Sequence, residues 1–242
     1  MIFKDPSVEL FAIADSTTVM KHIERIAREC WHSQDKITDI SYDSFIRNLI
    51  DSKHDAMLEH FVITLKFDTD RGVTHEMVRH RVASYAQTST RYVNYSKEKF
   101  GSQISVVKPF EFDPFEPTQE VSIPMMYSED PEKQKYYSCQ MNSFDVWMHS
   151  MMVSEWAYMA LTAQFNRPAQ LARSVLPNST ATTIFVTANF REWRHILNLR
   201  AVGTTGAPHP DMKRVMTKAL NLLYTEFPIM FSDIYSAMEK KS

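Results

Sequence analysis

The chain has 242 residues, of which 44% are hydrophobic and 23% are charged, and its formal net charge is −2. This composition is typical of a globular protein with a substantial apolar core, in one large domain or two small ones, and it excludes a protein that coats nucleic acid by bulk positive charge. The sequence has no apolar run of membrane-spanning length and no signal-peptide layout, and its two cysteines make neither a disulfide framework nor a metal site. We therefore expect a cytoplasmic protein without a membrane partner or a bound metal.

Hydrophobic spacing predicts a mixture of strands and helices in the first half of the chain. Cys30 shares the helical spacing of Val19 and Ile23, which predicts a buried thiol on the first helix. Residues 61–67 alternate between apolar and polar types, as in a half-buried strand. The predicted elements are, in chain order, a short strand over residues 8–14, a helix that begins near residue 16, a helix over residues 41–52, the strand over residues 61–67, a helix over residues 74–84, and extended segments over residues 91–95 and 103–107.

The second half begins with an acidic segment over residues 109–131 that holds five of the eleven prolines, which predicts a long surface loop. A long helix is predicted over residues 132–163, and its methionines and aromatic residues are typical of a core or a subunit interface. A helix from residue 168 to 176 and a strand over residues 182–187 follow. Asn189 and Glu192 then predict a capping box for a helix over residues 189–199. Strands and helices alternate without a regular βαβ rhythm, which predicts an α+β fold with a mixed sheet flanked by helices.

A first basic cluster, interleaved with tyrosines, lies within 21 residues between Arg71 and Arg91. Positive charge at this density repels itself unless an anion neutralises it. The residues alone leave four interpretations open: a phosphate-bearing small molecule, single-stranded nucleic acid stacked on the tyrosines, internal carboxylates, or a solvated face with local ion pairs.

A second cluster lies within 28 residues and comprises Arg173, Asn189, Arg191, His195 and Arg200. Free backbone N–H groups at the start of the Asn189 helix suit an anion. On a regular helix, at ~100° per residue, Arg200 lies about 140° from His195. The two side chains therefore serve the same spot only if the helix has ended or another subunit contributes. Two separated clusters favour a ligand with several phosphates.

The first cluster contains the run Arg79-His80-Arg81, then seven residues, then Ser89 followed by Thr90-Arg91-Tyr92. With this spacing and the landmarks that accompany it, the sequence resembles the flavin-dependent thymidylate synthase family over about residues 52–200. The accompanying landmarks, in order, are His54, Glu59-His60, the run from Ala172 to Pro177, Asn189-Phe190-Arg191, and the segment from His195 to Arg200.

The resemblance implies a single α+β domain over residues 1–242 that assembles as a homotetramer. It implies FAD as cofactor, NADPH and methylenetetrahydrofolate as co-substrates, and conversion of dUMP to dTMP. Neither Cys30 nor Cys139 stands in an electropositive context that would make a nucleophilic thiolate. A route in which reduced flavin supplies hydride needs no thiol.

The resemblance also implies the site residues. Arg200 is the implied catalytic residue, because it would stabilise negative charge at N3 of the pyrimidine. The residues implied at the cofactor are His54, Ala56, Arg79, His80, Arg81, Gln87, Asn189, Arg191 and His195. Those implied at the pyrimidine nucleotide are Glu76, Arg79, Gln87, Ser89, Thr90, Arg91, Arg173 and Arg200.

The chain departs from the family at two positions beside the signature run. Glu76 stands where the family usually has Gln, and Gln87 stands where it often has Glu. The exchange preserves one amide and one carboxylate. A carboxylate accepts hydrogen bonds but cannot donate them, so altered base recognition is the alternative, with dCMP as substrate of a methylase or a hydroxymethylase. A hypothesis of another class is a single-stranded nucleic-acid-binding module, although the resemblance implies no nucleic-acid partner.

Overall fold

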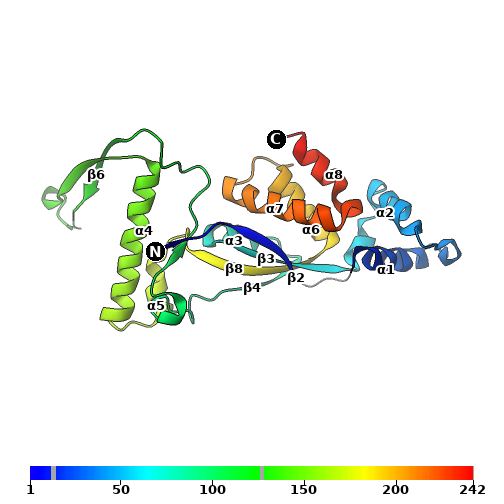
Figure 1. The fold of residues 1–242 in the computed structure, drawn as a ribbon, viewed down its shortest axis with the longest axis horizontal. Coiled ribbons are helices and arrows are strands. Elements are labelled where there is room, and N and C mark those ends of the chain that lie inside the picture. Colours follow the sequence, from blue (N-terminus) through cyan, green and yellow to red (C-terminus); the bar gives the residue numbers. More distant parts are fainter. Residues whose placement is uncertain (12–14, 126–127, 242) are drawn as a thin grey trace. The chain divides into compact units, whose positions relative to one another are not determined.

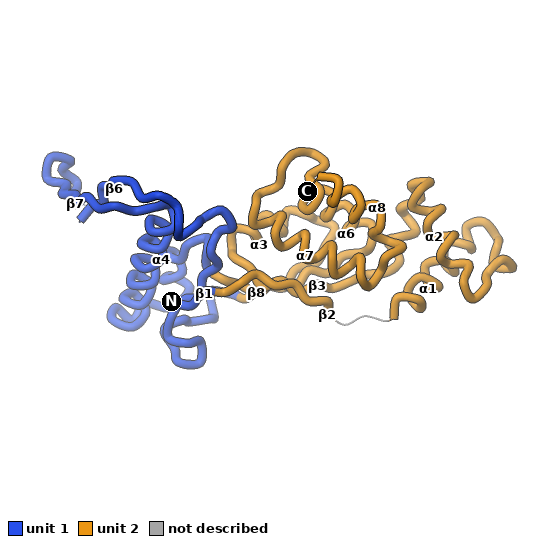
Figure 2. The backbone as a smooth tube through the Cα atoms, turned by 45° about the horizontal axis from the view of Figure 1, so that its top comes forward, with its two compact units in different colours: residues 1–3, 89–180 blue, residues 4–88, 181–242 orange. Residues whose placement is uncertain are grey.

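The structure is a computed structural model that describes residues 1–11, 15–125 and 128–241 (Figure 1). These residues form two compact units, each discontinuous in the sequence (Figure 2). Unit 1 comprises Met1–Phe3 and Ser89–Thr180, and unit 2 comprises Lys4–Thr88 and Ala181–Ser242. The prediction of a single domain over residues 1–242 stays a prediction.

Unit 2 is built on a four-stranded antiparallel sheet in the order β2-β3-β8-β4. Its strands are β2 (Ser7–Phe11), β3 (Val62–Asp70), β4 (Ala83–Gln87) and β8 (Ala181–Asn189). The central strands pair over nine residues, from Val62 opposite Asn189 to Asp70 opposite Ala181. Alternate residues of both central strands are buried, because their side chains point to opposite faces of the sheet. The strands predicted near residues 61–67 and 182–187 are confirmed.

Helices pack on the buried face of this sheet. The core joins Phe67 of β3 to Trp193 and Phe190, and Phe190 also contacts Phe227 and Phe231. The indole N–H of Trp193 donates to the carbonyl of Ile63 at 3.1 Å, so the largest buried side chain also leaves no unpaired donor. The helices of unit 2 are α1 (Ser16–Glu29), α2 (Ser41–Asp51), α3 (Arg71–Met77), α6 (Phe190–Leu197), α7 (Pro210–Glu226) and α8 (Pro228–Glu239), with short turns η1 (Gln34–Lys36) and η2 (Asp55–Glu59) and a π-helical turn η7 (Asn198–Val202).

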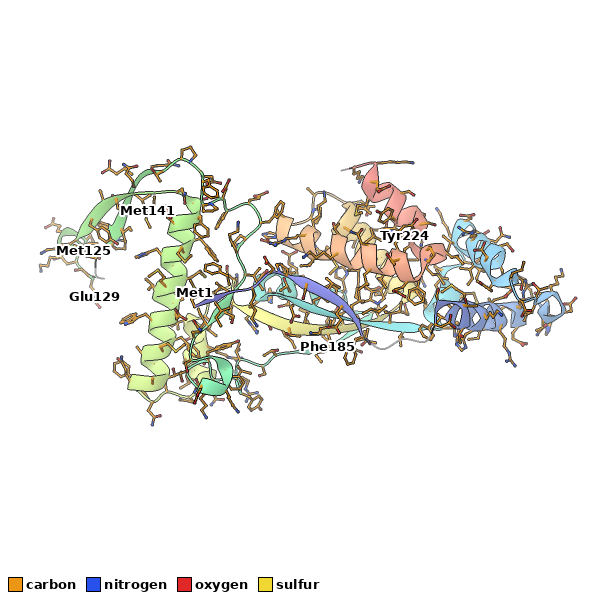
Figure 3. All side chains as sticks on the ribbon, viewed as in Figure 1. Met1, Met125, Glu129, Met141, Phe185 and Tyr224 are labelled. Carbon is orange, nitrogen blue, oxygen red and sulfur yellow. The ribbon has the colours of Figure 1, made fainter. Side chains whose placement is uncertain are left out.

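Unit 1 is organised around α4 (Ser143–Met159), which buries Trp147, Met151 and Tyr158 against Ile104 and Val106. Short β1 (Ile2–Phe3) pairs in parallel with β5 (Ser105–Val106). An antiparallel hairpin joins β6 (Gln119–Pro124) to β7 (Tyr136–Met141), and Figure 3 shows Met125 and Glu129 at one end of the hairpin and Met141 at the other. The remaining elements are η3 (Glu98–Phe100), η4 (Pro131–Lys133), the π-helical turn η5 (Ala160–Gln164), α5 (Ala169–Ala172) and η6 (Arg173–Val175). Parallel and antiparallel pairing both occur, and the predicted α+β class is confirmed.

Two predictions around residues 109–163 are wrong in part, although the predicted long helix is confirmed from Ser143 onward. The acidic proline-rich segment contains strand β6, and the predicted long helix begins eleven residues late, at Ser143. The cause is a reciprocal capping box: Asn142 accepts from the backbone N–H of Asp145, and the Asp145 carboxylate accepts from that of Asn142. The residues before this cap pair as β7 with β6.

The helix predicted over residues 74–84 is also wrong in its second half. Asp70 caps its start by accepting from the N–H of Val73, and α3 ends at Met77, so the signature run lies in the turn before β4. Cys30 is exposed, because it follows the last turn of α1. Residues 90–92 and 95–96 form turns, so the extended segment predicted over residues 91–95 is wrong. Of the strand predicted over residues 8–14, β2 covers 7–11, and residues 12–14 lie outside the described part of the chain.

Candidate functional site

The signature run sits on a tight connection between α3 and β4 in unit 2. Arg79 and Arg81 are exposed, whereas the imidazole between them is buried, with His80 only 8% exposed. The hydroxyl of Tyr85 on β4 lies 2.6 Å from the carbonyl oxygen of His80 and 2.9 Å from that of Met77. A single hydroxyl thereby links the end of the helix to the turn. Burial, followed by the nearby Glu192 carboxylate, raises the pKa of Tyr85 to about 12, so this donor keeps its proton.

His80 contacts the predicted catalytic arginine. Nε of Arg200 donates to Nε2 of His80 at 3.2 Å, and Nη1 of Arg200 donates to a carboxylate oxygen of Glu76 at 3.3 Å. Both members of the Arg200–Glu76 pair are about a quarter exposed, at 24% and 30% for their side chains. Three of the predicted site residues thus form one hydrogen-bonded cluster within unit 2.

The charge state of this cluster follows from its surroundings. Burial lowers the pKa of His80 to about 4, and the neighbouring Arg200 and His195 act in the same direction. The ring of His195 lies edge-on to His80, with 6.1 Å between centroids. On the other side, Nδ1 of His80 is 3.9 Å from Glu192, whose own pKa is raised by burial. His80 is therefore neutral near pH 7 and accepts from a guanidinium.

A π-helical turn brings Arg200 to this position. Helix α6 passes into η7 (Asn198–Val202), where the hydrogen bonds span five residues instead of four. Residues five apart then lie close to one face, so His195 and Arg200 both reach His80, whereas a regular helix would separate them by about 140°. The angular separation expected for a regular helix does not apply, because the regular helix ends before Arg200. The contact between Arg200 and His80 therefore needs no second subunit.

An open cavity of about 670 Å³ lies at the start of α6. Asn189 caps the helix by accepting from the N–H of Glu192 at 2.8 Å, and it lines the cavity together with Arg191 and His195. The N-cap half of the predicted capping box is confirmed, whereas the reciprocal bond from the Asn189 N–H to the Glu192 side chain is not formed. The cavity has cationic side chains and carboxylates in its wall: Lys53, Asp55, Glu59, Arg191, Glu192, Arg194 and Asp233.

The arginines of this wall are held by carboxylates. Arg191 pairs with Glu59 at 2.5 Å, and Arg194 pairs with Asp233 at 2.6 Å. The Arg191 pair is exposed on both sides, so it stabilises the fold little and a phosphate group can replace the carboxylate. Such a wall offers guanidinium groups for phosphates and carboxylates as acceptors for hydroxyl groups.

His54 and Ala56 do not line this cavity, although η2, which contains Ala56 and follows His54, contributes Asp55 and Glu59 to its wall. Both are exposed, and the ring of His54 lies edge-on to Trp31 at 5.7 Å. Arg79 and Arg81 also stand outside the lining. The cofactor roles implied for these four residues stay predictions.

Gln87 uses its amide inside the protein. Its Nε2 donates to the hydroxyl of Thr74 at 2.8 Å and to that of Thr182 at 3.3 Å. Both threonines are buried. Gln87 and Glu76 therefore belong to different networks in this structure, since Glu76 is bound to Arg200.

Four predicted nucleotide-binding residues belong to unit 1. Ser89, Thr90 and Arg91 form a turn in which the carbonyl of Ser89 accepts from the N–H of Tyr92 and of Val93. Thr90 is buried, whereas Arg91 is exposed and its guanidinium lies 5.5 Å from the centre of the Tyr92 ring. Arg173 is exposed at the end of α5. Their implied role stays a prediction.

A family model described as thymidylate synthase complementing protein matches residues 12–229. A flavin-dependent thymidylate synthase from Mycobacterium sp. strain KMS is 31% identical over 216 residues, with 87% of this chain and 78% of the relative covered. The enzyme of the same name from Mycolicibacterium gilvum is 29% identical and covers 94% of this chain and 84% of the relative. The chain belongs to the flavin-dependent thymidylate synthase family.

Solved structures share the fold of this family member. A UMP/dUMP methylase, PolB from Streptomyces cacaoi with bound 5-Br dUMP, has a TM-score of 0.70 at 20% identity, covering 98% of this chain and 97% of that chain. Thymidylate synthase X from Helicobacter pylori with FAD and dUMP has a TM-score of 0.65 at 18% identity, covering 95% and 99%. The fold expected from the resemblance is confirmed.

Sequence reasoning missed several residues of the cavity in this member of the flavin-dependent thymidylate synthase family. Arg194 follows Arg191 by three positions on α6, and that spacing was a usable signal. Asp233 lies on α8, far from α6 in the sequence, and no local pattern predicts that it lines the cavity. In residues 1–11, 15–125 and 128–241, no helix is long and apolar enough to cross a membrane, and no three metal-binding side chains gather.

Proposed function

We propose that this protein is a flavin-dependent thymidylate synthase that methylates dUMP reductively to dTMP, with methylenetetrahydrofolate and NADPH as co-substrates and FAD as cofactor. The observation that carries the proposal is the placement of Arg200. Its guanidinium is held by neutral His80 and by Glu76, and His80 in turn lies 3.9 Å from Glu192 in the first turn of α6.

The cavity at α6 fits FAD by size and donor chemistry. A volume of about 670 Å³ lies in the range of small-molecule sites. The free N–H groups after Asn189 and the guanidinium of Arg191 would hold the diphosphate, and the carboxylates of the wall would accept from ribose hydroxyls. FAD supplies the hydride chemistry when bound. His195 and the exposed Arg79 and Arg81 are proposed to complete this site, with His54, Ala56 and Gln87 at its border.

The nucleotide is proposed to bind through Ser89, Thr90, Arg91 and Arg173, whose donors suit a phosphate, and through Arg79, Glu76, Gln87 and Arg200. Arg200 would act on the ring. Its guanidinium would stabilise negative charge at N3, which polarises the conjugated ring, including the reacting C5–C6 bond, without a thiol.

A second candidate substrate is dCMP, because Glu76 presents a carboxylate next to Arg200. A carboxylate accepts from the exocyclic amine of cytosine while a guanidinium donates to N3, whereas a glutamine can pair with either base. The alternative proposal is therefore that the protein converts dCMP to a methylated or hydroxymethylated product.

We propose that the protein self-associates as a homotetramer through α4. Val146, Met152, Val153 and Trp156 are exposed, and at ~100° per residue they fall within about 120° around the helix. They lie opposite the buried Trp147 and Tyr158. Trp156, 69% exposed, is an unusual side chain to leave in water, and exposed apolar patches of this kind mark protein interfaces.

A cytoplasmic location stays a prediction.

The test of the function is the flavin spectrum of the purified protein together with product analysis after incubation with NADPH, methylenetetrahydrofolate and either dUMP or dCMP. We expect bound flavin and dTMP from dUMP. A protein that carries no flavin and makes neither product refutes the proposal. Product from dCMP alone establishes the second candidate. Salt-sensitive binding to oligonucleotides with indifference to FAD would instead support a single-stranded nucleic-acid-binding module.

A further inference from the structure

We propose that His80 is a positioning residue for Arg200. Its neutral imidazole accepts a hydrogen bond from the guanidinium and fixes its orientation, so that the remaining N–H groups of Arg200 face the substrate. This inference rests on the proposed function and deepens it. It gives His80 a role toward the substrate base that differs from the cofactor contact implied by its place in the signature run.

Two acceptors fix the plane of the Arg200 guanidinium. Nε–H donates to His80 Nε2 at 3.2 Å, and one N–H of Nη1 donates to Glu76 at 3.3 Å. An arginine side chain has five N–H donors, so three remain, one on Nη1 and two on Nη2. Within the described residues these three have no protein acceptor. One N–H on Nη1 and one on Nη2 can point in the same direction, which is the fork geometry that pairs with two neighbouring acceptors on a planar ring.

The acceptor role requires one tautomer of His80. Because Nε2 accepts, the ring proton is on Nδ1, which faces Glu192 at 3.9 Å. The charged or titratable groups that face the ring are Arg200, His195, Glu192 and, through Arg200, Glu76. Arg200 is a positive charge on the acceptor side of the ring. Protonation of His80 would therefore place a second positive charge against it and remove the acceptor.

The ring is held in place by its own backbone. The carbonyl of His80 is bound by the Tyr85 hydroxyl at 2.6 Å, and the backbone N–H of His80 donates to the carbonyl of Met77 at 3.1 Å. The side chain is 8% exposed, so packing leaves it little rotamer freedom. A fixed acceptor orders the long and flexible arginine side chain before the substrate binds. The rotamer entropy of Arg200 is then not lost during substrate binding.

The experiment is a mutant cycle of His80→Phe and Arg200→Ala, with His80→Gln as the conservative variant. Phe keeps the bulk of the ring and removes the acceptor, whereas the side-chain oxygen of Gln can accept near the position of Nε2. We expect kcat to fall roughly 10²-fold in His80→Phe with a smaller change in the KM for the nucleotide, and to stay within about fivefold in His80→Gln. In the Arg200→Ala background, His80→Phe should cost less than about threefold, because its only target is gone.

Flavin content is measured in every variant by absorbance. If His80 serves only the cofactor, His80→Phe loses flavin, and reconstitution with excess FAD restores its kcat; that result overturns the proposal. An equal, multiplicative loss in the wild-type and Arg200→Ala backgrounds also overturns it. His22→Phe is the matched control, because His22 is an exposed histidine of α1 whose ring lies edge-on to Phe61, and we expect it to leave kcat unchanged.

A failure of the proposed function is distinguished by a second readout that needs no turnover. The same four proteins are compared in denaturant unfolding, where the His80–Arg200 contact should give a non-additive free energy of unfolding. Wild-type protein that turns over neither dUMP nor dCMP refutes the proposed function. Additive unfolding free energies together with independent kinetic effects refute the positioning role.

Discussion

The buried His80 should make the folded protein less stable as the solution becomes acidic. Burial beside Arg200 lowers its pKa to about 4 in the folded state, against an ordinary value of 6.5 in the unfolded chain. Between these two values the unfolded chain holds a proton that the folded protein does not, so stability rises with pH in that window. This contribution of His80 to the free energy of unfolding is fully present above about pH 6.5 and is lost as the pH falls toward 4.

The size of this effect follows from the two pKa values. Each pH unit in the window changes the free energy of unfolding by about 1.4 kcal/mol, so the whole window contributes roughly 3 kcal/mol, of which about 2 kcal/mol falls between pH 7 and pH 4.5. This is a large share of the ~5–15 kcal/mol that stabilises a typical domain.

The assay is urea unfolding of the wild type and of His80→Gln at a fixed protein concentration, from pH 7 to pH 4.5. Gln does not titrate, so its curve should lack this part of the slope. Carboxyl groups without a contact to His80, such as Asp70, whose pKa is raised by burial, titrate in both proteins and cancel in the difference. The difference in unfolding free energy between the two proteins should therefore shift by roughly 2 kcal/mol across the range. Parallel curves would refute the reasoning, because they would mean that His80 is not shielded from protonation.

Three further outcomes are expected. Arg200→Ala should lower kcat at least about 10²-fold with flavin still bound, and unchanged turnover contradicts its ring-polarising role. Trp193→Phe should destabilise unit 2 by roughly 2 kcal/mol in denaturant unfolding, because it removes buried volume and leaves the Ile63 carbonyl without its donor; a change below about 0.5 kcal/mol contradicts this account. Trp156→Glu should reduce the assembled mass measured by light scattering, whereas Tyr136→Glu, which replaces an exposed aromatic residue of β7 in the same unit, should leave it unchanged. Equal masses for all three proteins refute the proposed interface.

The elements with a strong local pattern were predictable from the sequence. Alternation marks β3 and β8, and Asn189 marks the start of α6, since a strand period and a side-chain cap are local properties. The predictions failed where a local pattern was ambiguous. The segment after residue 77 continues a helical spacing, yet it turns and pairs with β8, because hydrogen bonds to a strand about a hundred positions away outweigh local preference.

The residues of the site divide in the same way. The sequence by itself determined which side chains the family uses, because the signature run and its spacing to Ser89 are local features. The contact of His80 with Arg200 joins positions 120 residues apart, and the tertiary structure alone decided it. A regular helix would have turned Arg200 away from His195, and the π-helical turn Asn198–Val202 brought both to the same imidazole. Such a turn depends on the packing around the end of α6, which the hydrophobic spacing of the chain does not encode.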